Sequence, residues 1–185
     1  GEGGALVTNS KKIYKKIKIL KAFGIDKDIT QRKKPGEYDV KFLGLNYRMT
    51  DFQAALGYLQ LKRYHSNLKR RHQIAKRYIY NFRRNKNIKY MPYSKNCSFF
   101  IFQIFTSQRN NLIKFLKEKK IQFSIHYANP LNKMTYYKKK YNLNNKSYKN
   151  AVNYGSTSIS LPVYPKLKNK EVDKICNLIK KIIKE

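Results

Sequence analysis

The chain has 185 residues, of which 41% are apolar, and a formal net charge of +32 at pH 7. A chain of this length and composition can form one compact hydrophobic core, or one core and part of a second. The sequence contains no run of about 20 apolar residues, which excludes a membrane-spanning helix. The first residues, GEGGALVTN, have neither a basic stretch nor an apolar region, so we expect no secretory signal there. They also run from a glycine-rich turn straight into an apolar stretch, which predicts that the chain is a fragment.

The positive charge is spread along the whole chain and comes mainly from lysine, in company with Asn, Ile, Tyr and Phe. These residue types share adenine- and thymine-rich codons, so a biased genome would favour Lys and Asn at every tolerant surface position. The alternative is binding to a polyanion such as nucleic acid, which a charge of this size also permits. No nucleic-acid-binding motif accompanies the charge. We therefore expect a compositionally biased surface and no nucleic-acid partner.

The two cysteines indicate a reducing compartment. Cys97 and Cys176 lie far apart in the sequence and have no partner at a metal-ligand spacing. This pattern predicts neither a disulfide framework nor a metal site. Together with the absence of a signal sequence, it leads us to expect a cytoplasmic protein.

The first predicted elements are a short strand and a helix. Residues 5–7 form an apolar run that we interpret as a buried strand. Ser10 can cap a helix whose end is marked by Gly24. One face of this helix carries Ile13, Ile17 and Leu20. Residues 25–38 are polar, contain Pro35-Gly36, and are typical of a surface loop.

Two helices are predicted next. Residues 42–61 read FLGLNYRMTDFQAALGYLQL, and Thr50 or Asp51 can cap the helix that follows the Asn-Tyr-Arg turn. A second helical stretch covers residues 68–82 and continues the first one with a kink near His65-Ser66. Its inward face carries Ile74, Ala75 and Tyr78, and its outward residues are mostly basic.

The rest of the chain mixes strands and helices. An aromatic run at 97–105 and an alternating run at 121–127 indicate strands, and 110–120 between them has helical spacing. Residues 136–148 have no regular pattern and are expected to cover the surface. A short strand at 158–161 ends at Pro162, and the last helix shows an apolar stripe of Val172, Ile175, Leu178, Ile179 and Ile182. This order predicts helices packed against one face of a small sheet.

Few residues suggest chemistry by themselves. Acidic residues are scarce and scattered, and GEGG lacks the spacing of a phosphate-binding loop. His65 and His72 lie on a charged helix and are expected to be solvated. His126 differs because it ends an alternating strand just before Tyr127 and a rigid Pro-Leu turn, where binding sites often occur. A structural role for His126 remains the alternative.

Asn46, Tyr47 and Arg48 form a donor-rich turn at the start of a helix. An Asn amide and an Arg guanidinium can both donate to phosphate or carboxylate groups. The alternative is a simple turn, in which Asn46 adopts a left-handed conformation and Arg48 is solvated. The residues alone leave both interpretations open.

Four phrases occur in one order: GEGGALVTN, GLNYRMTDFQAALGYLQL with KRRHQIAKRY behind it, IHYANPL, and SISLPVYPKLKNKEVDKI. Together they resemble the carboxy-terminal half of the DegT/DnrJ/StrS family of sugar aminotransferases. The resemblance runs nearly from end to end, and the second and fourth phrases are the most specific. It implies an α/β fold of the fold-type I class, of which this chain holds an α+β carboxy-terminal domain and the tail of the large domain.

The resemblance also implies a domain organisation and an activity. Residues 1–50 would be the incomplete tail of the large cofactor-binding domain, 51–83 the connecting helices, and 84–185 the small domain. The implied enzyme is a homodimer that uses pyridoxal 5'-phosphate. It transfers an amino group, usually from glutamate, to a 4-keto or 3-keto nucleotide-linked sugar, for amino-sugar or surface polysaccharide synthesis.

The implied roles of individual residues follow from the matching phrases. No catalytic residue is expected in this chain, because in the family the Schiff-base lysine lies just upstream of the position of Gly1; alone, the chain should be inactive. In the family, the loop matching Asn46 crosses the dimer interface and its Asn binds the cofactor phosphate of the partner subunit. Tyr47, Arg48, His126 and Tyr127 would contact the substrate.

One position departs from the family pattern H-Y-x-x-P-L-H. Asn132 stands where the second histidine is usual. An amide can bond a phosphate oxygen but cannot titrate as an imidazole does, so a detailed substrate preference does not carry over. Two further hypotheses stay open: a family member that has lost catalysis and serves as a binding or regulatory module, and a basic nucleic-acid-binding protein.

Overall fold

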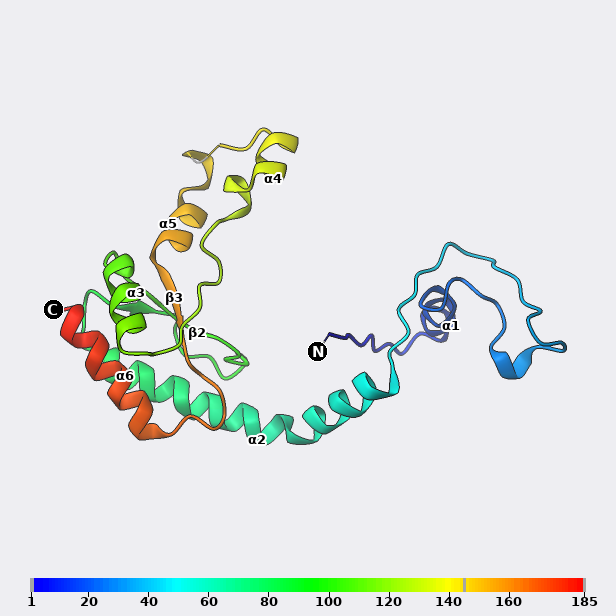
Figure 1. Cartoon of the computed structure of the whole chain (residues 1–185), viewed down its shortest axis with the longest axis horizontal. Coiled ribbons are helices and arrows are strands. Elements are labelled where there is room, and N and C mark those ends of the chain that lie inside the picture. The colour runs from blue at the N-terminus through cyan, green and yellow to red at the C-terminus, as the bar shows by residue number, and fades with distance from the viewer. Residues whose placement is uncertain (1, 145, 185) are drawn as a thin grey trace. The chain divides into compact units, whose positions relative to one another are not determined.

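The computed structural model describes residues 2–144 and 146–184 (Figure 1). Its contacts divide the chain into two compact units, Gly1–Arg63 and Tyr64–Glu185. The boundary falls inside the long helix α2 (Asp51–Phe82).

In the first unit, helix α1 (Lys11–Leu20) begins at the predicted cap. The Ser10 hydroxyl accepts a hydrogen bond from the amide of Ile13 at 3.4 Å, which satisfies one of the amides left free at a helix N-terminus. The turn after the helix closes at Gly24, whose φ is +75° and whose amide donates to the Ile19 carbonyl at 3.0 Å. The surface loop that follows contains one short 3₁₀ turn, η1 (Ile29–Gln31).

The buried strand predicted at residues 5–7 is wrong. No strand is present there, and the side chains of Leu6 and Val7 are 62% and 93% exposed. A strand needs a neighbouring backbone with which to exchange hydrogen bonds. Within the described residues no segment pairs with this run.

Helix α2 is one continuous helix of 32 residues, where we predicted two stretches joined at a kink. It starts with a capping box: Thr50 Oγ1 accepts from the Gln53 amide at 3.3 Å, and Gln53 Oε1 accepts from the Thr50 amide at 3.0 Å. The predicted inward face is confirmed, because Ile74, Ala75 and Tyr78 are fully buried.

The second unit contains a three-stranded antiparallel sheet in the order β1 (Lys89–Tyr90), β2 (Phe102–Phe105), β3 (Ser158–Leu161). Strand β3 matches the prediction. Strand β2 covers only the second part of the predicted run 97–105, because the chain bends before it: Phe99 has a φ of +44° and packs its ring on Tyr93.

The predicted strand at 121–127 is reduced to a single bridge. Ser124 exchanges two backbone hydrogen bonds with Ser160, at 3.1 and 2.7 Å, beside the edge of β3. The predicted alternation is present, since Ile121, Phe123 and Ile125 are partly buried. The backbone turns away after Ile125, so no longer ladder forms.

Helices α3 (Arg109–Glu118) and α6 (Asn169–Ile182) pack on the sheet together with α2, as expected for helices on a small sheet (Figure 1). The core of this unit includes Tyr78, Phe82, Phe102, Ile104, Leu112, Leu116, Ile159, Val172 and Ile179. It lies between the three helices and the strands and gives the neighbouring loops a rigid support.

The segment between residues 131 and 157 is more regular than predicted. It contains η2 (Leu131–Lys133), α4 (Thr135–Lys140), η3 (Lys146–Tyr148) and α5 (Lys149–Thr157), and α5 was not predicted at all. These short helices are mostly exposed, so they lack the apolar stripe by which helices are found in a sequence.

An ion pair ties α6 to α2. Nε of Arg77 donates to Oδ1 of Asp173 at 2.7 Å, and Nη2 donates to Oδ2 at 2.5 Å. Asn81 Nδ2 donates to the same carboxylate at 3.1 Å. The hydrogen bonds from Arg77, and more weakly that from Asn81, hold the pKa of Asp173 below its ordinary value.

A depressed carboxyl pKa stabilises the folded state above the ordinary pKa, and this stabilisation is lost as pH falls through the folded pKa. Replacing Asp173 by Asn is therefore expected to lower the free energy of unfolding at neutral pH by about 0.5–1 kcal/mol, a small value because both side chains are partly exposed. The difference from the unsubstituted protein should vanish in acid. Urea unfolding at a series of pH values measures it.

The matched control is Glu118→Gln, which removes the same charge from an exposed carboxylate outside the ion pair. Its effect on the free energy of unfolding at neutral pH should stay within about 0.5 kcal/mol. A loss for Asp173→Asn that stays constant from neutral to acid pH would contradict the role of the ion pair.

Candidate functional site

Asn46 lies on an exposed segment whose backbone is fixed by the residues after α1. The amides on either side of it donate across to that turn, Leu45 to the Leu20 carbonyl and Tyr47 to the Lys21 carbonyl, both at 2.8 Å. Asn46 itself forms an antiparallel bridge with Ala22. Its side chain is exposed, and within residues 2–144 and 146–184 its amide bonds to no other group. The backbone of Asn46 is thus held in place, while its exposed side-chain amide has no partner among the described residues.

This pairing requires glycine at two positions. A Cβ added to Gly44 would lie 2.0 Å from the Gly24 nitrogen. A Cβ added to Gly24 would lie 1.8 Å from the Phe42 carbonyl oxygen. The two backbones approach each other more closely than any side chain allows. The glycine before the Asn-Tyr-Arg turn therefore sets the position of Asn46.

The two residues after Asn46 are also exposed. The Arg48 guanidinium lies over the ring of Phe23, 5.2 Å from its centroid, a cation–π contact that orients the side chain. Tyr47 is 72% exposed. Asn46, Tyr47 and Arg48 all belong to the first unit, whereas His126 and Tyr127 belong to the second.

His126 is held at both its ring and its backbone. Nδ1 lies 2.9 Å from Oγ of Ser160 in β3, and Nε2 lies 3.4 Å from Oγ of Ser124. The His126 carbonyl accepts a hydrogen bond from Nε2 of Gln103 at 2.7 Å. The Gln103 side chain, in turn, accepts a hydrogen bond from the hydroxyl of Tyr154. The imidazole therefore has a defined orientation at the edge of the sheet.

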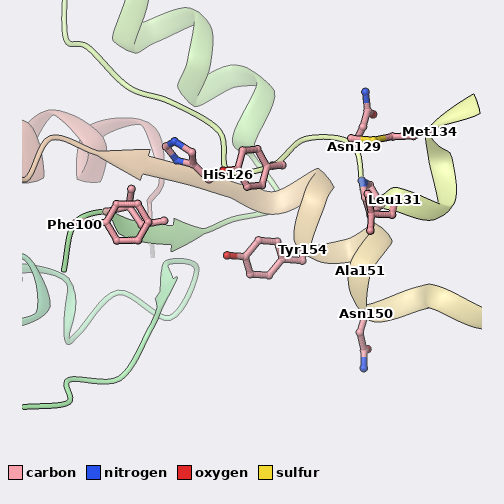
Figure 2. A pocket seen from close by; sticks show the side chains of 11 residues that line it. Phe100, His126, Asn129, Leu131, Met134, Asn150, Ala151 and Tyr154 are labelled. Atoms are coloured by element: carbon pink, nitrogen blue, oxygen red, sulfur yellow. The ribbon is translucent and has the colours of Figure 1, made fainter. Parts of the chain in front are cut away.

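A pocket of about 640 Å³ opens beside His126. Figure 2 shows the rings of Phe100, His126 and Tyr154 at one end of it, with Leu131 and Met134 at the other. Its volume is within the range of small-molecule sites, which are typically apolar with a few polar groups that fix orientation. The 71% exposed ring of Tyr127 also lines it.

The position that departs from the family pattern is buried. Asn132 lies in η2 and is only 4% exposed. A ligand in the adjoining pocket therefore meets the neighbouring Leu131 rather than the Asn132 amide. Asn132 therefore lies outside the lining of this pocket.

The remaining candidates behave differently from one another. His65 is exposed as predicted, but His72 is partly buried: Nδ1 lies 2.9 Å from the Tyr93 hydroxyl, and the ring packs edge-on against Phe99.

Both cysteines are free thiols, and burial raises the pKa of Cys176 to about 12. Among the described residues, no group of three or more His, Cys, Asp or Glu could hold a metal ion.

Sequence reasoning missed the residues that support His126. Gln103, Tyr154 and Ser160 were not selected as site residues. A signal was present for Gln103, because it is the only polar residue in the run FFIFQIF. A polar side chain in a buried strand needs hydrogen-bond partners, so it points to a network. No comparable signal marks Tyr154, whose partner is distant in the sequence.

The sequence profile of the DegT/DnrJ/EryC1/StrS aminotransferase family matches residues 1–180. The chain belongs to this family. The resemblance inferred from the four phrases is thereby confirmed. The expected fold is confirmed as well, since solved structures of sugar aminotransferases superimpose on nearly the whole chain.

Three relatives illustrate the similarity. The uncharacterized protein MJ1066 of Methanocaldococcus jannaschii is 33% identical over 100% of this chain and 50% of its own length. A UDP-4-amino-4,6-dideoxy-N-acetyl-beta-L-altrosamine transaminase of Campylobacter jejuni is 31% identical over 99% of this chain and 50% of its own. The PMP form of Spr1654, a candidate sugar aminotransferase of Streptococcus pneumoniae, superimposes with a TM-score of 0.83 at 29% identity, covering 97% of this chain and 47% of that one.

The chain thus spans about half the length of the curated relatives it matches. Spr1654 has also been solved in a PLP form, which identifies pyridoxal phosphate as the cofactor of that protein and agrees with the cofactor expected from the resemblance. In the part of the chain that the structure describes, no helix combines the length and apolarity needed to cross a membrane.

Proposed function

We propose that the chain is part of a pyridoxal 5'-phosphate-dependent aminotransferase that acts on a keto nucleotide-linked sugar. Membership of the family and the Campylobacter jejuni transaminase, which acts on a UDP-linked amino sugar, support the substrate class. Glutamate is the proposed amino donor and a homodimer the proposed active form. The product would serve amino-sugar or surface polysaccharide synthesis.

The observation that carries this proposal is the free amide of Asn46. A cofactor phosphate is a dianion and is bound best by donors that need little further ordering. Asn46 fits this requirement because its backbone is bonded on both sides and its side chain is exposed. The residues present therefore suit a phosphate group. Asn46 would donate to it, in a site completed by the partner subunit.

The pocket beside His126 is the proposed place of the sugar substrate. Its walls carry the imidazole of His126 and the phenol of Tyr127, which can bond hydroxyl groups. Because Nδ1 of His126 is engaged by Ser160, a substrate would meet the Nε2 side, where the bond to Ser124 is long at 3.4 Å. Arg48 and Tyr47 are proposed as further substrate contacts.

When bound, pyridoxal phosphate supplies the carbonyl group that takes an amino group from the donor and passes it to the keto carbon. Residues 1–185 would contribute cofactor anchoring and substrate binding. The lysine that holds the cofactor would lie outside these residues, as the resemblance implies, so the chain by itself should not transaminate. Incubation of the chain with pyridoxal phosphate and borohydride, followed by mass spectrometry and an activity assay, should find no defined modified lysine and no turnover.

Replacing Asn46 by Ala is expected to weaken cofactor binding by about 1–3 kcal/mol, since a hydrogen bond to a charged group is lost. The measurement is the dissociation constant of pyridoxal phosphate, in an active transaminase that contains this chain together with the cofactor-binding lysine. An exposed asparagine elsewhere, replaced as Asn111→Ala on α3, should leave that constant unchanged. Equal constants for the Asn46 variant and the unsubstituted enzyme would rule out the proposed role.

A further inference from the structure

Gln103 is a buried polar side chain in the middle of an apolar strand. It is 7% exposed, and its neighbours in β2, Phe102 and Ile104, belong to the core. Burying an amide costs free energy unless its donor and acceptor are both bonded. Gln103 meets this condition with two bonds, one from each end of the amide: Nε2 donates to the His126 carbonyl at 2.7 Å, and Oε1 accepts from the Tyr154 hydroxyl.

These two bonds reach the two walls of the pocket. His126 and Tyr127 belong to the loop on one side, and Tyr154 belongs to helix α5 on the other. The walls also meet directly, because a Cβ added to Gly155 would lie 2.6 Å from the Ala128 carbonyl oxygen. Gln103 therefore connects, through its side-chain amide, two segments that line the same cavity.

The ring of His126 depends on this arrangement. Its Nδ1 bond to Ser160 requires the His126 backbone to stay near β3, where the Ser124–Ser160 bridge two residues earlier also holds the chain. The Gln103 amide holds that backbone through the carbonyl of the same residue. One buried amide is thus bonded to the backbone of the residue whose imidazole lines the pocket.

We propose that Gln103 is a positioning residue of the pocket: it holds the His126 carbonyl and the Tyr154 hydroxyl together, so that the His126 imidazole keeps its bond to Ser160. The use of the pocket for a sugar substrate rests on the proposed function. The positioning itself can be measured without any ligand or activity.

The chain offers a clean probe, because it has only three histidines. The ring nitrogen signals of His65, His72 and His126 can be recorded by long-range ¹H–¹⁵N NMR on the 185-residue chain. In Gln103→Leu, which loses both bonds, the His126 signals should move while those of His65 and His72 stay. The control Gln60→Leu, at an exposed position of α2, should move none of them.

Two further variants each remove one of the two hydrogen bonds, and they replace Gln103→Leu as the test if that variant does not fold. At a pH where its carboxyl is ionised, Gln103→Glu can still accept from Tyr154 but has no hydrogen to donate to the His126 carbonyl, so the His126 signals should then move nearly as far as in Gln103→Leu. Tyr154→Phe keeps the bond to His126 and should give a smaller movement. If Gln103→Leu fails to fold, these two variants decide.

Unmoved His126 signals in both Gln103 variants would overturn the proposal. So would a movement of all three histidines together, which would mean that Gln103 only stabilises the fold.

In an active transaminase containing this chain, Gln103→Glu should raise KM for the keto sugar about tenfold, the effect of one lost hydrogen bond, with kcat and cofactor content little changed. If that enzyme has no activity on keto sugars, the proposed function fails while the NMR result still stands.

Discussion

Replacing Tyr78 by Ala is expected to lower the free energy of unfolding of the second unit by about 3–5 kcal/mol. The side chain is fully buried, and its ring stacks on Phe102 with centroids 4.9 Å apart. Its hydroxyl donates to the Pro162 carbonyl at 3.0 Å, and burial raises its pKa. Truncation leaves a cavity between α2 and the sheet and removes the partner of that carbonyl.

The measurement is urea unfolding followed by circular dichroism, with two comparisons. Tyr78→Phe retains the ring and should cost only about 1 kcal/mol, the value of the hydrogen bond. Tyr80→Ala lies two residues away on the same helix but is 65% exposed, so its effect should stay within about 1 kcal/mol. Similar losses for Tyr78→Ala and Tyr80→Ala would show that the core does not lie where the structure has it.

Replacing Gly44 by Ala is expected to separate the Asn46 segment from the turn after α1, at a cost of about 3 kcal/mol. The new Cβ would lie 2.0 Å from the Gly24 nitrogen and 2.4 Å from the Phe23 carbonyl carbon. Because both contacts are with backbone, no side chain can move aside to relieve them. The hydrogen bonds that Leu45 and Tyr47 donate to this turn should break, and Asn46 should lose its fixed position.

Hydrogen exchange measures this locally, through the protection of the amides of Phe23, Leu45 and Tyr47. The matched control is Gly57→Ala in α2, where an added Cβ meets nothing within 4 Å. That change should slightly stabilise the helix, by about 0.5–1 kcal/mol. If the three amides remain protected in Gly44→Ala, the close approach of the two glycines is not what holds the segment.

Local signals in the sequence were enough to find most of the secondary structure. The caps at Ser10 and Thr50, the strand ending at Pro162 and the apolar stripe of α6 were all predicted and are present. Each depends on residues only a few positions apart, either through a hydrogen bond within one turn or through periodic spacing. The short exposed helices α4 and α5 carry neither signal and were missed.

The candidate site was only partly accessible from the sequence. Asn46 and His126 stood out because polar groups at the ends of elements are where ligands are met. The structure adds how each is held. The close approach of Gly24 and Gly44 fixes the backbone next to Asn46. Hydrogen bonds to Gln103 and Ser160 hold the backbone and the ring of His126. Their roles toward cofactor and substrate stay predictions.

The amino-acid order by itself determined the capped helices, the helix with an apolar stripe and the strand ending at Pro162, and it was enough to indicate the family. Only the tertiary structure decided which apolar residues are buried: Phe102 enters the core, whereas the equally apolar Val7 is 93% exposed. It also decided that Tyr154 would meet Gln103 and that Gly24 would meet Gly44. The reason is physical, because burial and hydrogen bonding depend on what the folded chain brings alongside a residue, whereas helix caps and periodicity depend on its immediate neighbours.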